Sequence, residues 1–311
     1  MDLQRGPRGA HRGRHEPRAA LRNEVVGKRR RGERRRACRW GGHVTHPASR
    51  PAGVYARSVP AIDLNSDLGE SFGTWKLGDD DAMLDLVSSA NIACGFHAGD
   101  PSTLRRVCQG AADRGVTIGA QVSYPDLVGF GRRFIDMDPG ELRDAVLYQL
   151  GALDGFAQVA GTGVGYIKPH GALYHACISH PDQARAVVQA AHEYDPSMAV
   201  LGAPGSPLLS VADAMGMEPV AEAFADRAYL ADGRLVPRTA PDAVLTDPAA
   251  VAARAVAIAV EHRVTAIDGS EVAIRARSIC IHGDTPGAVE MARAVRAGLE
   301  LASVGVHSFV I

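Results

Sequence analysis

The sequence lacks the features that mark several large classes of protein. It has five cysteines in 311 residues, an odd number, and no two of them form a C-x-x-C pair. This pattern argues against a disulfide framework and a zinc ribbon, and it favours free thiols in a reducing compartment. No apolar run approaches the length needed to cross a bilayer, so nothing in the sequence supports a membrane span. We therefore expect a cytoplasmic protein that is not inserted in a membrane.

Aromatic residues and nucleotide-binding loops are also scarce. Phe, Trp and Tyr make up 5% of the residues, whereas Ala, Gly and Val are abundant. Small apolar residues suit helices packed on a parallel sheet better than they suit an aromatic-rich sandwich. The chain contains no G-x-x-x-x-G-K-[ST] phosphate loop, and the glycines within 161–165 lack the spacing of a dinucleotide fingerprint. The sequence therefore offers no standard loop for nucleotide phosphates.

The net charge of -1 hides two physically different segments. Residues 1–59 carry sixteen Lys and Arg against four acidic residues, so the rest of the chain is strongly acidic. The first segment has no apolar periodicity and cannot bury enough surface to offset its ordering entropy, so we predict that it is disordered. We favour an extension that is not part of the native protein. The alternatives for this segment are a basic arm that binds nucleic acid and an Arg-rich targeting peptide. For the protein as a whole we expect no nucleic-acid partner.

From residue 60 onward, strand-like and helix-like segments alternate without a break in composition. Three helices have clear start signals, an aspartate N-cap followed by proline, at Asp100-Pro101, Asp138-Pro139 and Asp247-Pro248. The last of these helices is expected to reach residue 263. The predicted strands lie at 61–65, 90–94, 116–120, 164–168, 198–202, 218–224 and 278–282. This repetition predicts a single catalytic domain, residues 60–311, folded as an α/β barrel of about seven parallel strands.

The segment Val164–Tyr174 shows most clearly how these strands end. It reads Val-Gly-Tyr-Ile-Lys-Pro-His-Gly-Ala-Leu-Tyr, an apolar run that stops at a lysine, an imidazole and a glycine. Pro169 resists further ladder pairing, and Gly171 permits a turn that other residues make less easily. Lys168 and His170 are alternate residues, so we expect them to project to similar sides of one strand end.

Comparable polar residues follow the other predicted strands. In a barrel the loops after the strands converge on one face, where active sites lie, and we expect a catalytic or ligand-binding site there. Simpler roles exist for single members, since Asp284 can cap a helix and Arg133 can pair with Asp126 or Asp136. The candidate residues are Asp67, Glu70, Asn91, His97, Arg132, Arg133, Lys168, His170, Glu222, Asp226, Arg227, His282 and Asp284.

Five motifs in this set resemble the LamB/YcsF family, and the resemblance covers residues 60–311. They are DLNSDLGESFG at 63–73, NIACGFHAGD at 91–100, KPHGALY at 168–174, FADR at 224–227 and HGD at 282–284. The resemblance implies a seven-stranded α/β barrel related to glycoside hydrolases and deacetylases. It also implies that the chain acts with subunits B and C to open 5-oxoproline to L-glutamate, coupled to hydrolysis of ATP to ADP and phosphate.

This reaction suggests roles for the candidates. A lactam is an unreactive amide; phosphate placed on its carbonyl oxygen creates a leaving group, and attack by water then needs a base and charge stabilisation. Because the chain lacks a phosphate loop, the cosubstrate ATP is expected to be bound mainly by the partner subunits. The expected catalytic residues are Asp67, Glu70, His97, Lys168, His170, His282 and Asp284. The residues expected to bind substrate or phosphate are Asn91, Arg132, Arg133, Glu222, Asp226 and Arg227.

Two other functions stay open. A metal-dependent deacetylase or amidase would hold a divalent ion with Asp67, His97 and His170, although their spacing matches no compact motif. A non-catalytic subunit would only stabilise or position its partners.

Two further expectations concern the site itself. At position 121 this sequence has glutamine, Gln121, whereas many members of the family that it resembles have histidine. An amide is neither an acid nor a base at neutral pH, and it is a poor ligand for a transition metal. We also expect the residues at the open mouth of the barrel to be exposed. Replacing Asp67, Lys168 or His170 should then change stability little.

Overall fold

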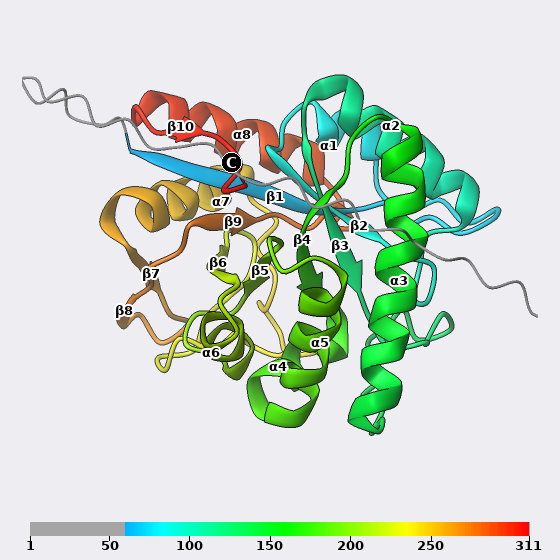
Figure 1. The fold of residues 1–311 in the computed structure, drawn as a ribbon. Helices are drawn as coiled ribbons and strands as arrows, with labels where there is room; N and C mark the ends of the chain where they lie inside the picture. Colours follow the sequence, from blue (N-terminus) through cyan, green and yellow to red (C-terminus); the bar gives the residue numbers. More distant parts are fainter. Residues whose placement is uncertain (1–59, 311) are drawn as a thin grey trace, which may run out of the picture. The chain divides into compact units, whose positions relative to one another are not determined.

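The computed structural model describes residues 60–310 (Figure 1). Residues 1–59, for which we predict disorder, lie outside the described residues, as does Ile311. The strands are β1 (Ala61–Leu68), β2 (Ser89–Ala93), β3 (Thr117–Val122), β4 (Val164–Pro169), β5 (Ala199–Gly202), β6 (Glu218–Phe224), β7 (Arg263–Thr265), β8 (Glu271–Ala273), β9 (Ser278–Cys280) and β10 (Gly305–Val306). The helices are α1 (Asp80–Leu84), α2 (Pro101–Arg114), α3 (Pro139–Val159), α4 (Gly171–Ser179), α5 (Pro181–Tyr194), α6 (Pro207–Ala214), α7 (Pro248–Val256), the π-helical η1 (Ala257–Glu261) and α8 (Ala288–Leu301).

Seven parallel strands form a closed barrel, as predicted. They follow the order β1-β2-β3-β4-β5-β6-β9, and the barrel closes because β9 pairs with both β6 and β1. The short strand β10 adds a parallel pairing with the first residues of β1. Figure 1 shows the helices arranged around the strands. The carboxyl ends of the strands therefore meet at one face, which the loops after the strands build up.

Strand β1 shows how the sequence divides the barrel interior from its outer layer. Side chains alternate along a strand, so Asp63, Asn65 and Asp67 share one face and Leu64 and Leu68 share the other. Leu64 and Leu68 belong to the main hydrophobic core, which lies between the strands and the helices. Asp63 and Asn65 are almost fully buried, and they bond to polar groups of neighbouring strands. This inward face of β1 is thus polar, and Asp67 extends the polar column to the face where the strands end.

The predicted helix starts at Asp100, Asp138 and Asp247 are confirmed. The carboxylate of each accepts hydrogen bonds from backbone N–H groups in the first turn of its helix. The last helix differs, because α8 begins after Gly287 without a side-chain cap. Asp284 is therefore not the N-cap of this helix, and its carboxylate is available for other contacts.

The structure adds a hairpin that the alternating pattern does not predict. Strands β7 and β8 pair antiparallel between residues 263 and 273, outside the barrel. Three-residue strands carry too little periodicity to be recognised from sequence. The preceding helix also differs from expectation, because α7 ends at Val256 and passes into η1, which stops at Glu261.

The described cysteines Cys94, Cys108, Cys177 and Cys280 are free and buried. This confirms the prediction of free thiols for these four. Among the described residues, no helix combines the length and apolarity that crossing a membrane requires.

Candidate active site

Strands β1 and β4 bring Asp67, Lys168 and His170 together at the face where the strands end. Nζ of Lys168 lies 3.4 Å from Oδ1 of Asp67. Nδ1 of His170 lies 3.7 Å from Oδ2 of the same carboxylate. Because β1 extends to Leu68, further than predicted, Asp67 belongs to the strand itself and has its rigidity. Three of the residues that the sequence suggests as catalytic thus lie side by side.

The turn that presents His170 depends on Gly171. Gly171 has a φ of 58°, in the left-handed region that favours glycine. A Cβ at this position would lie 2.5 Å from the carbonyl oxygen of Gly131. The backbone N–H of His170 donates to the carbonyl of Val122 at 2.8 Å, and α4 begins at the next residue. Strand, turn and helix therefore fix the position of His170.

Lys168 reaches into the barrel interior. Its Nζ lies 2.9 Å from Oε2 of Glu222, 3.2 Å from Oδ1 of Asn65 and 3.3 Å from Sγ of Cys280. Burial alone would lower the pKa of Lys168, but the neighbouring anionic groups, Asp67 first among them, raise this pKa well above its usual value. Lys168 is therefore a fixed positive charge and not a nucleophilic amine.

Asp67 is held as a carboxylate by its surroundings. Burial opposes its ionisation, but the charge of Lys168 and the neighbouring His170 imidazole bring the pKa of Asp67 well below its usual value. Nδ2 of Asn91 donates to Oδ1 of Asp67 at 2.8 Å, and the hydroxyl of Tyr166 donates to Oδ1 of Asn91 at 2.6 Å. Asn91, expected to bind substrate or phosphate, lies inside the barrel and orients Asp67.

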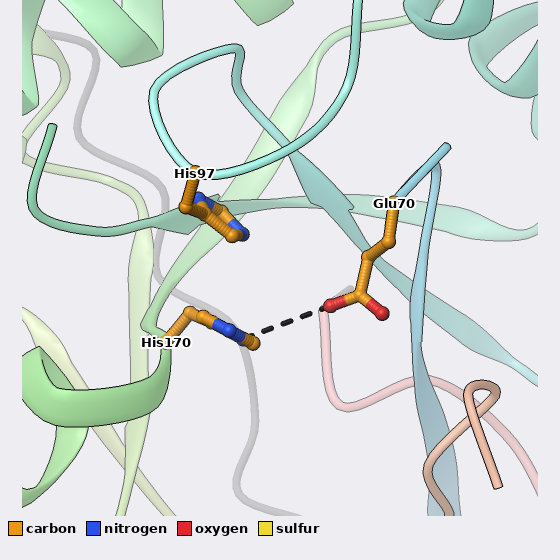
Figure 2. Close-up of side chains that lie close together, drawn as sticks. All are labelled: Glu70, His97 and His170. Carbon is orange, nitrogen blue, oxygen red and sulfur yellow. Dashed lines mark ion pairs between the residues drawn. The ribbon is translucent and has the colours of Figure 1, made fainter. Parts of the chain in front are cut away.

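A second cluster lies beside Asp67, and Figure 2 shows three of its side chains pointing toward one another. Nε2 of His97 lies 3.0 Å from Oε1 of Gln121, and the Gln121 amide donates to Oε1 of Glu70 at 3.0 Å. Nδ1 of His170 lies 3.7 Å from the same Glu70 oxygen, and the rings of His97 and His170 stack with centroids 4.3 Å apart. Burial and the charge of Asp67 raise the pKa of Glu70 well above its usual value. Burial and the charge of His170 lower the pKa of His97.

Glu70, His97 and His170 are also the group that could hold a metal ion. One ligand atom from each lies within 4.8 Å of the others. This set differs from the predicted one, in which Asp67 takes the place of Glu70. The Gln121 amide is bonded to Nε2 of His97 and Oε1 of Glu70, whereas Nδ1 of His97 has no hydrogen-bond partner among the described residues. Imidazole and carboxylate are ordinary ligands of divalent transition metals, so the donor set fits such an ion.

His282 and Asp226 form a further pair on neighbouring strands. His282 follows β9 and Asp226 follows β6, and Nδ1 of His282 lies 2.8 Å from Oδ2 of Asp226. Asp226 is fully buried, and it does not line the pocket at this face. The structure thus places Asp226, expected to bind substrate or phosphate, behind His282.

A pocket of about 520 Å³ opens where these residues meet, a volume typical of small-molecule sites. The predicted residues in its wall are Asp67, Arg132, Lys168, His170, Arg227 and His282. Aromatic and further basic side chains complete the wall, among them Phe134, Tyr174, His175, His180, Phe224 and Arg238. Glu70 and His97 are not among the lining residues.

Two arginines in the pocket wall share one carboxylate. A guanidinium nitrogen of Arg132 lies 2.8 Å from Oδ2 of Asp284, and one of Arg238 lies 3.6 Å from the same oxygen. The two side chains remain 43% and 28% exposed, so both can meet an anionic ligand. Asp284, expected to be catalytic, holds these two cations side by side.

Three of the predicted binding residues make contacts within the chain. Glu222 lies inside the barrel against Lys168. Arg133 pairs with Asp126, one of its two simpler roles, and does not line the pocket. Arg227 lines the pocket, but its guanidinium donates to two backbone carbonyl groups of the loop after β6.

The expectation that the mouth residues are exposed is wrong. The side chains of Lys168, His170 and Asp67 are 3%, 6% and 8% exposed. Loops after the strands cover them; the carbonyl oxygen of Phe130, for example, lies 3.1 Å from Nε2 of His170. Replacing these residues therefore removes buried polar contacts and affects stability as well as chemistry.

Sequence reasoning missed Arg238 and the bridging role of Gln121. Arg238 lies in the long loop after β6 and belongs to no motif, so no sequence signal marks it. Gln121 has such a signal, because it departs from the family pattern inside a strand that delivers other polar residues. Its contacts with His97 and Glu70 depend on how neighbouring strands are aligned, which the pattern alone does not give.

Comparison with known proteins gives a consistent result. The model of the LamB/YcsF family matches residues 62–310. A protein of Mycobacterium avium, named as the A subunit of 5-oxoprolinase, is 58% identical over 251 residues, which cover 81% of this chain and 100% of the relative. One of Nocardia farcinica with the same name is 59% identical over 249 residues, covering 80% and 99%. The crystal structure of a lactam utilization protein from Thermus thermophilus superposes with a TM-score of 0.76 at 44% identity, covering 80% of this chain and 100% of that one.

The family match spans the whole described barrel, including all five motifs and the pocket that they build. The two relatives, which are 58% and 59% identical to this chain, align over nearly their full length. The chain therefore belongs to the LamB/YcsF family.

Proposed function

We propose that this chain is the A subunit of an ATP-dependent 5-oxoprolinase, which opens 5-oxoproline to L-glutamate. The observation that carries the proposal is the combination of relatives that bear this enzyme's name with a pocket whose wall holds a carboxylate, a buried ammonium and imidazoles. This set supplies the charges and proton carriers that hydrolysis of an amide requires.

The reaction has a chemical logic that explains the need for ATP. Phosphorylation of the lactam carbonyl oxygen releases ADP and makes carbon C5 electrophilic. Water then adds to C5 with loss of a proton to a base, and the C5–N bond breaks as the ring nitrogen takes up a proton. The product is an acyl phosphate of glutamate, and a second water releases phosphate from it. The chain's own residues must therefore hold an anionic intermediate and move protons at two atoms.

The pocket offers a place for each part of such an intermediate. Arg132 and Arg238 present two guanidinium groups, which suit the substrate carboxylate or the phosphate. Lys168 and the ionised Asp67 lie deeper, and they fix the electrostatic field at the reacting carbon. A volume of about 520 Å³ leaves room for a phosphate beside the five-membered ring.

We further propose that ATP is bound mainly by subunits B and C. The sequence has no phosphate loop of the G-x-x-x-x-G-K-[ST] type. The relatives are named as one lettered subunit of an enzyme, which supports an assembly of several chains. The present chain would then receive the activated lactam and carry out its hydrolysis.

The test is to measure glutamate and phosphate release from 5-oxoproline and ATP with this chain alone and with subunits B and C. We expect turnover with the partners present and little without them. Robust turnover by the isolated chain would refute the partner requirement, and no turnover with all three subunits would refute the proposed substrate.

The metal-dependent alternative keeps one supporting observation, the approach of Glu70, His97 and His170 to within 4.8 Å. It predicts a stoichiometric ion in the purified chain and hydrolysis without ATP. The non-catalytic alternative predicts that substitutions in the pocket leave the activity of the complex unchanged.

A further inference from the structure

The pair Asp226–His282 has a geometry that fixes the imidazole in one orientation. Oδ2 of Asp226 accepts from the backbone N–H of His282 at 3.1 Å and lies 2.8 Å from Nδ1 of the same residue, while Oδ1 lies 3.1 Å from Nδ1. The ring also stacks on Phe224, with centroids 5.5 Å apart and planes 14° apart. The His282 ring is thus held by a carboxylate at one nitrogen and by an aromatic face along its plane.

This contact also decides which nitrogen carries the proton. Burial alone would raise the pKa of Asp226, but the charge of His282 and its hydrogen bonds bring this pKa below its usual value. An ionised carboxylate can only accept, so Nδ1 must donate to it. The lone pair of the neutral imidazole is therefore on Nε2. No described residue forms a hydrogen bond with this nitrogen, and His282 lines the pocket.

The other two imidazoles among the residues expected to be catalytic are placed differently. Nε2 of His170 lies 3.1 Å from the carbonyl oxygen of Phe130, and Nδ1 faces the carboxylates of Asp67 and Glu70. His97 is fully buried and does not line the pocket. Of His97, His170 and His282, only His282 combines a carboxylate partner, a fixed tautomer and an unbonded nitrogen in a residue of the pocket wall.

We infer that Nε2 of His282 is the atom that moves protons in the reaction, and that Asp226 is its positioning residue. The inference rests on the proposed function. Nε2 takes a proton from the attacking water as the O–C5 bond forms, and returns it to the ring nitrogen as the C5–N bond breaks. The remaining hydroxyl proton leaves to solvent as the C5=O bond of the acyl phosphate forms. Asp226 does not touch the substrate and so differs from its predicted role; it holds the tautomer and stabilises the imidazolium that forms between the two steps.

The charged groups around His282 are compatible with this cycle. The carboxylates of Asp67 on β1 and of Asp226 both interact electrostatically with His282. Arg238, from the loop after β6, lies near Asp226 and acts on it electrostatically. In the proposed cycle the imidazole of His282 carries a positive charge near these two carboxylates. It becomes neutral again when the ring nitrogen of the substrate accepts the proton.

The tautomer can be tested without any activity. In ¹⁵N-labelled protein, the chemical shifts of the histidine nitrogens distinguish a protonated Nδ1 from a protonated Nε2, and the His282 signals are assigned by their loss in His282→Gln. At a pH where the ring is neutral, we expect a protonated Nδ1 in the wild type, and a mixture in Asp226→Asn, because an amide can donate as well as accept. A protonated Nε2 in the wild type would overturn the inference.

The catalytic role is tested by kinetics of the complete complex. His282→Gln and Asp226→Asn should lower kcat by about 10²–10⁴-fold, the usual contribution of general acid–base catalysis, with KM nearly unchanged. The acidic limb of the pH–rate profile should disappear in His282→Gln. Matched controls are His192→Gln on α5 and Asp213→Asn on α6, which lie outside the pocket and should retain wild-type turnover.

The outcomes separate this inference from the proposed function. Suppose that the wild-type complex opens 5-oxoproline and that the folded His282→Gln variant has a kcat within about threefold of the wild-type value. The role assigned to the pair Asp226–His282 is then wrong, and the proposed function stands. If the wild-type complex does not act on 5-oxoproline, both fail. Circular dichroism shows whether Asp226→Asn folds; if it does not, His282→Gln and the wild-type tautomer decide the inference.

Discussion

Lys168 and Glu222 form an ion pair inside the barrel, with Nζ 2.9 Å from Oε2 and the two side chains 3% and 0% exposed. The same ammonium lies 3.4 Å from Asp67. One buried cation therefore neutralises two carboxylates that come from β1 and β6, the two strands that flank β9. This links the charge needed at the site to the stability of the fold.

We predict that Lys168→Met abolishes turnover and also destabilises the protein, because it leaves two buried carboxylates without their partner. Removing one member of a buried ion pair typically costs about 3–5 kcal/mol. The double variant Lys168→Met/Glu222→Gln should recover part of the stability and none of the activity. Urea denaturation and the coupled assay measure the two effects, with exposed Lys76→Met as the control. An unchanged denaturation midpoint in Lys168→Met would show that the carboxylates do not depend on this ammonium.

We predict that Glu70→Gln stabilises the protein at pH 8 and has little effect at pH 4.5. Burial and the charge of Asp67 raise the pKa of Glu70, so the folded protein binds this proton more tightly than the unfolded chain. The stability that Glu70 contributes is therefore present at low pH and is lost as the pH rises through its raised pKa. The gain at pH 8 should be about 1 kcal/mol or more. Denaturation midpoints at the two pH values measure it, with exposed Glu193→Gln as the control; a loss of stability at pH 8 would contradict the argument.

We predict that Gln121→Leu destabilises the protein and Gln121→His much less. The Gln121 amide is the hydrogen-bond partner of both His97 and Glu70, and leaving a buried polar group unpaired costs about 1–3 kcal/mol. Histidine, which the family resemblance suggests at this position, can still pair with one of them. Gln109→Leu, which breaks an exposed hydrogen bond on α2, is the matched control and should change stability by less than about 0.5 kcal/mol. Equal stability of Gln121→Leu and the wild type would rule out the bridge.

We predict that treatment with a chelator of transition metals leaves the activity of the complex intact when Mg²⁺ and ATP are supplied. The reason is that the proposed reaction draws on the charges and proton carriers of the pocket wall and on no metal ion held by Glu70, His97 and His170. Metal analysis of the purified chain accompanies the assay. A stoichiometric metal that is lost in Glu70→Gln, and whose removal stops turnover, would favour the metal-dependent alternative.

We predict that a chain beginning at Pro60 keeps the melting temperature of the full chain. The family match begins at residue 62 and β1 begins at Ala61. Pro60 is retained because its carbonyl accepts from the N–H of Gly305 at 2.8 Å. A fall of many degrees on deleting residues 1–59 would show that this segment packs on the domain.

The sequence predicts the architecture well because strand ends carry strong local signals. Proline, glycine and aspartate mark where β4 stops and where α2, α3 and α7 begin, and these signals do not depend on distant residues. They also bring Lys168 and His170 to one face correctly. The hairpin β7–β8 lies outside the barrel and is too short for its periodicity to be recognised.

The fine structure of the site is less predictable because it depends on strand alignment. Asp67 and Lys168 lie at the right ends of their strands, but their depth in the barrel follows from the register between strands, which sets which side chains face each other. The same holds for Glu222, which the sequence suggests as a ligand-binding residue and which serves as the partner of Lys168. Arg238 comes from a loop without a motif, so only the folded chain places it at the pocket.

The closure of the barrel has a consequence for how the protein is made. Strand β1 pairs with β9 and β10, and the N–H of His307 donates to the carbonyl of Ile62 at 3.1 Å. A ribosome must therefore synthesise the residues up to β9 and β10 before β1 can find these two neighbours, and those residues must first leave the exit tunnel. Until then, the nascent sheet has an open edge of the kind that attracts other chains, and closing it requires contacts between the first and the last of the described strands, which form slowly.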